Sequence, residues 1–170
     1  HRPRPVLAAA LATAVLLGAA LPAAAQPRPP SAAGDELVVQ ARDALRTNDR
    51  TRLAALTQRL QDAGHPLAMW ADYWRLSSLL PQAQQPELDA FYARWGGSYV
   101  EDRLRNDWLL ELGKRRDWAG VRAEFPRFRM NDDREVTCYA LLARHEAGEL
   151  PRAALREQAR AAWLAQRDVD

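Results

Sequence analysis

Histidine and acidic residues that could bind a metal ion occur together near the C-terminal end of the chain. His145 and Glu146 are adjacent, but a zinc-protease helix also needs a second histidine one turn after the first. Asp132, Asp133 and Glu135 supply carboxylates without the alternating ligand spacing of a calcium loop. Since Asp132 and Glu135 are three residues apart, a capping box at the start of a helix explains them better. We therefore expect no metal site and no cofactor.

The residues needed for catalysis do not form a recognisable set either. The chain contains no glycine-rich loop that would hold a phosphate and no nucleophile elbow. A glycosidase-type carboxylate pair is defined by its separation in space, so it cannot be selected from 22 scattered acidic residues. The sequence thus predicts no catalytic residue in this chain, and a complete small hydrolase is disfavoured.

Aromatic and basic side chains are the remaining candidates for a binding surface. The six tryptophans suit stacking on sugar rings or filling the gaps between helices, and their places on apolar helical faces favour the second interpretation. They are Trp70, Trp74, Trp95, Trp108, Trp118 and Trp163. Seven arginines suit an anionic polymer, but intervening acids favour a solvated, salt-bridged surface. They are Arg103, Arg105, Arg115, Arg116, Arg127, Arg129 and Arg134.

The single cysteine, Cys138, leaves three interpretations open. In an exported protein an odd cysteine indicates either a disulfide partner elsewhere or a reactive thiol. Its place in a helical pattern also allows a buried, inert thiol. The residues alone do not choose among them.

Residues 1–25 have the composition of a secretory signal peptide. Arg2 and Arg4 precede an apolar run over residues 6–21, and three alanines at 23–25 offer a cleavage site. Sixteen residues are fewer than the roughly 20 that a membrane span needs, so no stable membrane anchor is expected. Removing the leader lowers the basic residues from 24 to 22, against 22 acidic residues, so the net charge falls to zero. Without a basic field, nucleic acid is not an expected partner.

Helical patterns fill the chain from Asp35 onwards, after a proline-rich tether over residues 26–34. The clearest predicted helix has Val100, Leu104, Trp108 and Leu112 on one face. In that helix, Ser98 and Glu101 have capping-box spacing, Gly113 is expected to end it, and Asp117 to cap the next. The other helices are expected over about residues 35–48, 50–63, 66–80, 86–95, 118–125, 132–147 and 151–164.

This succession of helices predicts an all-α fold over residues 35–170. No segment shows the alternation or the hairpin signals of β-strands. Short antiparallel helices joined by turns are typical of helical hairpins stacked as an α-solenoid, in which each hairpin buries its apolar face against the next. The chain begins at His1 and stops at Asp170 without a tail, which suggests a fragment of a longer protein.

Three passages resemble the N-terminal superhelical domain of the soluble lytic murein transglycosylases. They are HPLAMWADYWRL at 65–76, LRNDWLLELGKRRDW at 104–118 and CYALLARHEAGELPRAALREQARAAWL at 138–164, in the order of that family. The sequence AQRDVD after Leu164 departs from the family pattern. The resemblance implies a periplasmic scaffold of an enzyme that cleaves peptidoglycan glycan strands and leaves 1,6-anhydromuramyl ends.

The resemblance also implies where catalysis lies. The family's catalytic glutamate belongs to a C-terminal lysozyme-like domain, and no segment here matches its glutamate-serine motif, so no catalytic residue is carried over. Cys138 corresponds to a cysteine that the family pairs with another shortly after the last helix, which implies that it is half of a disulfide. The alternative is a stand-alone periplasmic helical-repeat module that binds another protein.

Overall fold

The computed structural model of the protein describes residues 32–165, which form helices joined by turns and loops, without a β-strand. The all-α prediction is therefore confirmed for this part of the chain. The predicted signal peptide and residues 26–31 of the predicted tether lie outside the described residues. The helices are α1 (Ala32–Arg46), α2 (Arg50–Asp62), α3 (Ala68–Ser77), α4 (Gln85–Trp95), α5 (Tyr99–Arg115), α6 (Trp118–Glu124), the 3₁₀ turn η1 (Phe125–Arg127), α7 (Arg134–Glu146) and α8 (Arg152–Leu164).

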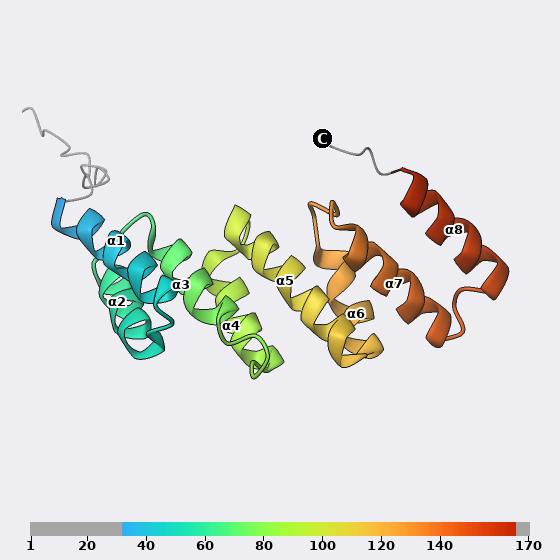
Figure 1. Ribbon diagram of the computed structural model, residues 1–170, viewed down its shortest axis with the longest axis horizontal. Helices are drawn as coiled ribbons and strands as arrows, with labels where there is room; N and C mark the ends of the chain where they lie inside the picture. The colour runs from blue at the N-terminus through green and yellow to red at the C-terminus, as the bar shows by residue number, and fades with distance from the viewer. Residues whose placement is uncertain (1–31, 166–170) are drawn as a thin grey trace, which may run out of the picture.

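Each helix packs mainly against helices that are close to it in the chain. α1 packs against α2 and α3, α3 against α2 and α5, α5 against α4, α6 and α7, and α7 against α6 and α8. Figure 1 shows the helices following one another along the long axis of the molecule, with α1 and α2 at one end and α8 at the other. None of the described helices is long and apolar enough to cross a membrane.

The first helix begins inside the predicted tether. α1 starts at Ala32, so residues 32–34 of the segment expected to be extended are helical. Alanine is the strongest helix former, and Asp35 in the first turn interacts favourably with the positive end of the helix dipole. These two effects outweigh Gly34, whose helix propensity is poor.

Apolar side chains form two adjoining clusters. The first lies among α1, α2 and α3 and consists of Ala41, Ala44, Leu53, Leu56, Leu60, Ala68 and Ala71. The second extends from the end of α3 to α7, and Leu88, Phe91, Leu104, Trp108, Leu109, Val121 and Val136 are among its buried members. Trp95 packs against both clusters, so the apolar interior continues from one to the other.

Three of the predicted helix starts, at Asp49, Ser98 and Asp117, are confirmed by side-chain caps. The carboxylate of Asp49 accepts a hydrogen bond from the N–H of Arg52 at 2.9 Å, and that of Asp117 accepts one from Gly120 at 2.9 Å. For α7 the capping residue is Asp133, whose carboxylate accepts from the N–H of Val136, so the prediction of an Asp132 cap is wrong by one residue. The Asp133 carboxylate also accepts a hydrogen bond from the Asn106 amide of α5 at 3.2 Å.

The third helix begins later than Pro66 predicts. α3 starts at Ala68, and the two residues before it form a turn. The imidazole Nδ1 of His65 accepts a hydrogen bond from the N–H of Leu67 at 3.1 Å. His65 Nε2 therefore carries the proton and donates to Asp35 at 3.2 Å, which joins this turn to α1.

The cap at the start of α5 is close to the predicted capping box. The Ser98 hydroxyl accepts from the N–H of Glu101 at 3.3 Å. The Glu101 carboxylate reaches one residue further than in a capping box and accepts from the N–H of Gly97 at 2.7 Å. The Ser98 N–H donates instead to the carbonyl of Trp95.

The end of α5 differs from the prediction that Gly113 terminates it. The helix continues to Arg115, and Arg116 takes the left-handed conformation with φ of 58°. Gly113 is buried within the helix, facing Tyr139 of α7, and a Cβ at this position would lie 2.2 Å from Tyr139 Cδ2. Glycine is needed here for the close approach of α7 to α5.

The last helix is less buried than its sequence pattern predicts. Leu155, Ala159 and Ala162 are half-buried, but Trp163 is 69% exposed and Leu164 67% exposed. Since α8 packs mainly on α7, only one side of its apolar surface is covered among the described residues.

Replacing Gly113 with alanine tests the close contact between α5 and α7. We expect Gly113→Ala to lower the free energy of unfolding by about 1–3 kcal/mol, because the new methyl group overpacks the Tyr139 ring. In a Tyr139→Ala background the same change should instead stabilise α5 by about 1 kcal/mol, the helix-propensity difference between the two residues. Urea unfolding of the four proteins measures this cycle, and equal effects in both backgrounds would contradict it.

Candidate functional site

A buried ion pair joins α5 to α6. The guanidinium of Arg105 donates through Nη1 to Glu124 Oε2 and through Nη2 to Glu101 Oε1 at 2.8 Å. Gln85, at the start of α4, donates to the other oxygen of Glu124 at 3.1 Å, and Arg127 does so at 3.3 Å. Arg105 is 3% exposed and Glu124 2% exposed. We call these five residues the Glu124 cluster; it ties α4, α5, α6 and η1 together.

Tyr92 lies against this cluster and has an unusual hydroxyl group. Its ring packs under the guanidinium of Arg105, with Arg105 Cζ 3.9 Å from the ring centroid. The hydroxyl oxygen is buried and has no hydrogen-bond partner among residues 32–165. Burial raises the pKa of Tyr92, and the negative charge of Glu124 raises it further.

A second buried carboxylate, Asp72, joins α3 to α4. It accepts hydrogen bonds from Arg75 Nη2 at 2.8 Å, from Arg94 Nη1 at 2.7 Å and from the indole Nε1 of Trp95 at 2.9 Å. The Asp72 side chain is 1% exposed, so its charge is compensated entirely within the protein. The Asp72 carboxylate therefore has a structural role, since it links α3 to α4.

A third carboxylate, Asp102 of α5, holds the segment after η1. Its two oxygens accept from the backbone N–H groups of Arg129 at 2.8 Å and Met130 at 2.7 Å. One turn later on α5, the Asn106 amide donates to Asp133 at 3.2 Å, beside the cap of α7. Glu124, Asp72 and Asp102 thus hold the helices in place. They belong to three separate networks and do not converge on a reaction centre.

Three of the five residues considered as metal ligands have structural contacts, and these are Asp133, Glu135 and His145. No group of three or more His, Cys, Asp or Glu side chains that could hold a metal ion occurs among residues 32–165. The ring nitrogen Nδ1 of His145 lies 2.7 Å from the carbonyl of Leu150, to which it donates a hydrogen bond across the turn after α7. Glu135 accepts from the hydroxyl of Tyr139 at 2.7 Å.

The six tryptophans differ in how far their side chains are exposed to solvent. Trp108 is buried, Trp163 is exposed, and the other four are half-buried. Trp70 belongs to an aromatic group on α3 and the start of α5, with ring centroids 5.9 Å from Tyr73 and 6.0 Å from Tyr99. Tyr99 is 59% exposed, so one edge of this group faces solvent.

Most of the seven arginines are exposed and paired with acids, but Arg105 is buried, so the prediction of a solvated surface is wrong for that residue. Five form ion pairs with acids on the described helices and loops, and these are Arg103, Arg105, Arg115, Arg127 and Arg129. Arg134 lies over the ring of Trp163, with 5.3 Å between its Cζ and the ring centroid. Arg116 provides the left-handed residue after α5.

Cys138 is exposed on α7, so the interpretation as a buried thiol is wrong. It forms no disulfide within residues 32–165. The thiol lies beside a shallow pocket between α7 and α8, which is also lined by Trp163, Glu135 and Arg134. The disulfide and the reactive thiol both stay predictions.

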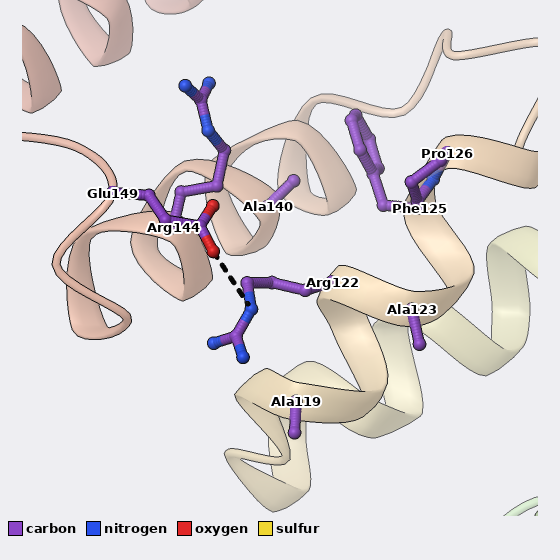
Figure 2. A pocket seen from close by; sticks show the side chains of 8 residues that line it. All are labelled: Ala119, Arg122, Ala123, Phe125, Pro126, Ala140, Arg144 and Glu149. Atoms are coloured by element: carbon purple, nitrogen blue, oxygen red, sulfur yellow. Dashed lines mark ion pairs between the residues drawn. The ribbon is translucent and has the colours of Figure 1, made fainter.

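A pocket of about 480 Å³ between α6, η1 and α7 was not predicted from the sequence. Ala119, Arg122 and Ala123 recur at helical spacing on α6, and Ala140 and Arg144 are one turn apart on α7. Phe125 and Pro126 of η1 and Glu149 complete the lining. Figure 2 shows Arg122 and Glu149 facing each other, with the Arg144 guanidinium extending away from that pair.

The chain shows no significant match to a protein-family model, to a curated protein or to a solved structure.

Removing Glu124 should destabilise the fold strongly. Glu124→Ala leaves the buried guanidinium of Arg105 without its main counter-charge, so we expect a loss of about 3–5 kcal/mol in the free energy of unfolding. The matched control is Asp43→Ala, which breaks the exposed Arg46–Asp43 pair and should cost no more than about 0.5 kcal/mol. Similar losses in the two variants, measured by urea denaturation, would refute the role assigned to the cluster.

Tyr92 should make the protein sensitive to alkaline pH. A pKa raised in the folded state means that the stabilising effect of the neutral phenol is complete below the ordinary pKa of 10.0 and is lost as the pH rises above it. We therefore expect Tyr92→Phe to lose less stability above about pH 10 than the original protein. At neutral pH the variant should be equally or more stable, because the buried hydroxyl has no partner. Thermal unfolding at a series of pH values tests both statements.

Proposed function

We propose that the chain is the N-terminal helical scaffold of an exported lytic murein transglycosylase. The observation that carries this proposal is that the three passages that resemble the family lie on helices and on the turns between them. Residues 65–76 cover the turn before α3 and most of that helix, residues 104–118 run along α5 to the start of α6, and residues 138–164 cover most of α7 and all of α8. The passages therefore fall on helices and the turns that join them, in family order.

The packing of the helices supports an α-solenoid as the finer description of the fold. Neighbouring helices bury their apolar faces against one another, and the two clusters adjoin through α3 and Trp95. In a solenoid each helical hairpin relies on the next one in the same way. The scaffold would form an arc of this superhelix.

The proposed role is to shape or hold the peptidoglycan glycan strand for a catalytic domain beyond this chain. No residue here is assigned to the cleavage of the glycan bond, and no cofactor is needed. The protein would act in the periplasm after removal of the signal peptide. The exposed edge of the Trp70 group is compatible with contact to sugar rings, since aromatic faces stack on them.

A stand-alone periplasmic helical-repeat module that binds another protein is the second candidate. The exposed apolar residues Trp163 and Leu164 at the end of α8 favour it, because exposed large apolar side chains are common where proteins meet. Such a module would have no affinity for murein.

Sedimentation with peptidoglycan sacculi separates the two candidates. We expect the 170-residue chain to co-sediment with purified sacculi and to release no anhydromuropeptides, because the catalytic glutamate lies elsewhere. The unfolded chain and cellulose particles are the controls for nonspecific adsorption. Failure to bind sacculi more than cellulose would contradict the scaffold proposal, and release of anhydromuropeptides would contradict the separate catalytic domain.

The gene provides an independent check of the same proposal. Its reading frame past the Asp170 codon should encode a lysozyme-like domain with a glutamate-serine motif. A stop codon directly after Asp170 would overturn the transglycosylase assignment and favour the protein-binding module.

A further inference from the structure

The pocket between α6, η1 and α7 has an excess of positive charge. Arg122 is loosely held, with its Nε 3.6 Å from Glu149 Oε1 and its Nη1 3.5 Å from the carbonyl of Ala143. Arg144 has no ion pair or side-chain hydrogen bond among the described residues. The residues that line the pocket thus carry two positive charges and one negative charge. The Arg144 guanidinium, which extends away from Arg122 and Glu149 (Figure 2), has all its donors available to an anion.

The rest of the pocket is apolar and has room for small groups. Ala119 and Ala123 come from α6 and Ala140 from α7, so methyl groups stand where longer side chains would fill the space. Phe125 and Pro126 close one end (Figure 2). An inorganic anion would use the arginine and leave this apolar surface uncovered, so the pocket suits a larger ligand.

We propose that this pocket binds the C-terminal end of a peptide with small apolar side chains. The terminal carboxylate pairs with Arg144, because a guanidinium matches a carboxylate with two parallel hydrogen bonds. A peptide N–H donates to Glu149, which is exposed and only weakly engaged by Arg122. The small side chains cover Ala119, Ala123 and Ala140. The proposal does not rest on the lytic transglycosylase assignment.

The test is an NMR titration of the isotope-labelled 170-residue chain with three probes. The first probe, N-acetyl-alanyl-alanine, carries the free carboxylate and the small side chains. The second is the same dipeptide with a C-terminal amide, which lacks only the charge. The third, sodium acetate, supplies only the carboxylate. We expect the free acid to shift the backbone signals of residues 119–126 and 140–149. The amide and acetate should bind at least about tenfold more weakly, since a charge-assisted hydrogen bond or the apolar contact is lost.

Two variants show whether the arginine in the pocket is responsible. Arg144→Ala should weaken binding of the free acid at least about tenfold, because it removes the one unpaired guanidinium. Arg59→Ala removes the same charge from an exposed position on α2, near the other end of the molecule, and should leave binding unchanged. Both positions are exposed, and thermal unfolding checks that the variants keep the fold.

Four results would overturn the proposal. Equal shifts with acetate and with the free acid would indicate an adventitious ion only. Equal binding of the amide and the free acid would remove the role of the carboxylate. Undiminished binding by Arg144→Ala, or shifts confined to residues outside the pocket, would place the peptide elsewhere.

Discussion

The structure depends most on the need to compensate the guanidinium of Arg105, which is buried at the centre of α5. A charge removed from water is tolerated only with counter-charges and hydrogen bonds at short range, and Glu124 and Glu101 supply them. Gln85 of α4 donates in turn to the Glu124 carboxylate. This requirement fixes the distance and the rotation of α4 and α6 relative to α5. Since α3 and α7 also pack on α5, the two halves of the molecule are oriented through the same helix.

Local features of the sequence placed each helix to within about three residues of its observed bounds. Asp49 and Asp117 cap them as predicted, and the face of Val100, Leu104 and Trp108 is buried. These features act within a few residues, so they are visible in a single sequence. Gly113 was misinterpreted because a glycine at a helix end and a glycine at a helix crossing have the same local pattern, and only the position of α7 separates the two roles.

The candidate sites were predicted less well, because they are assembled from different helices. Arg122 and Arg144 are 22 positions apart and have no motif in common, so nothing in the sequence brings them to one pocket. The same holds for Arg105 and Glu124, which the sequence presents as ordinary surface charges. For Cys138, the helical pattern left a buried thiol, a reactive thiol and a disulfide open, and the structure excludes only the buried thiol.

The packing of each helix on its neighbours in the chain has a consequence for how the protein forms. When most contacts are local in sequence, little chain entropy is lost before the contacts form, and folding is fast. During synthesis, helices α1 to α3 can therefore fold and pack against one another before the residues of α7 and α8 have been added. The interior would be built progressively from the N-terminal end, with each new helix closing over the apolar surface left by the one before.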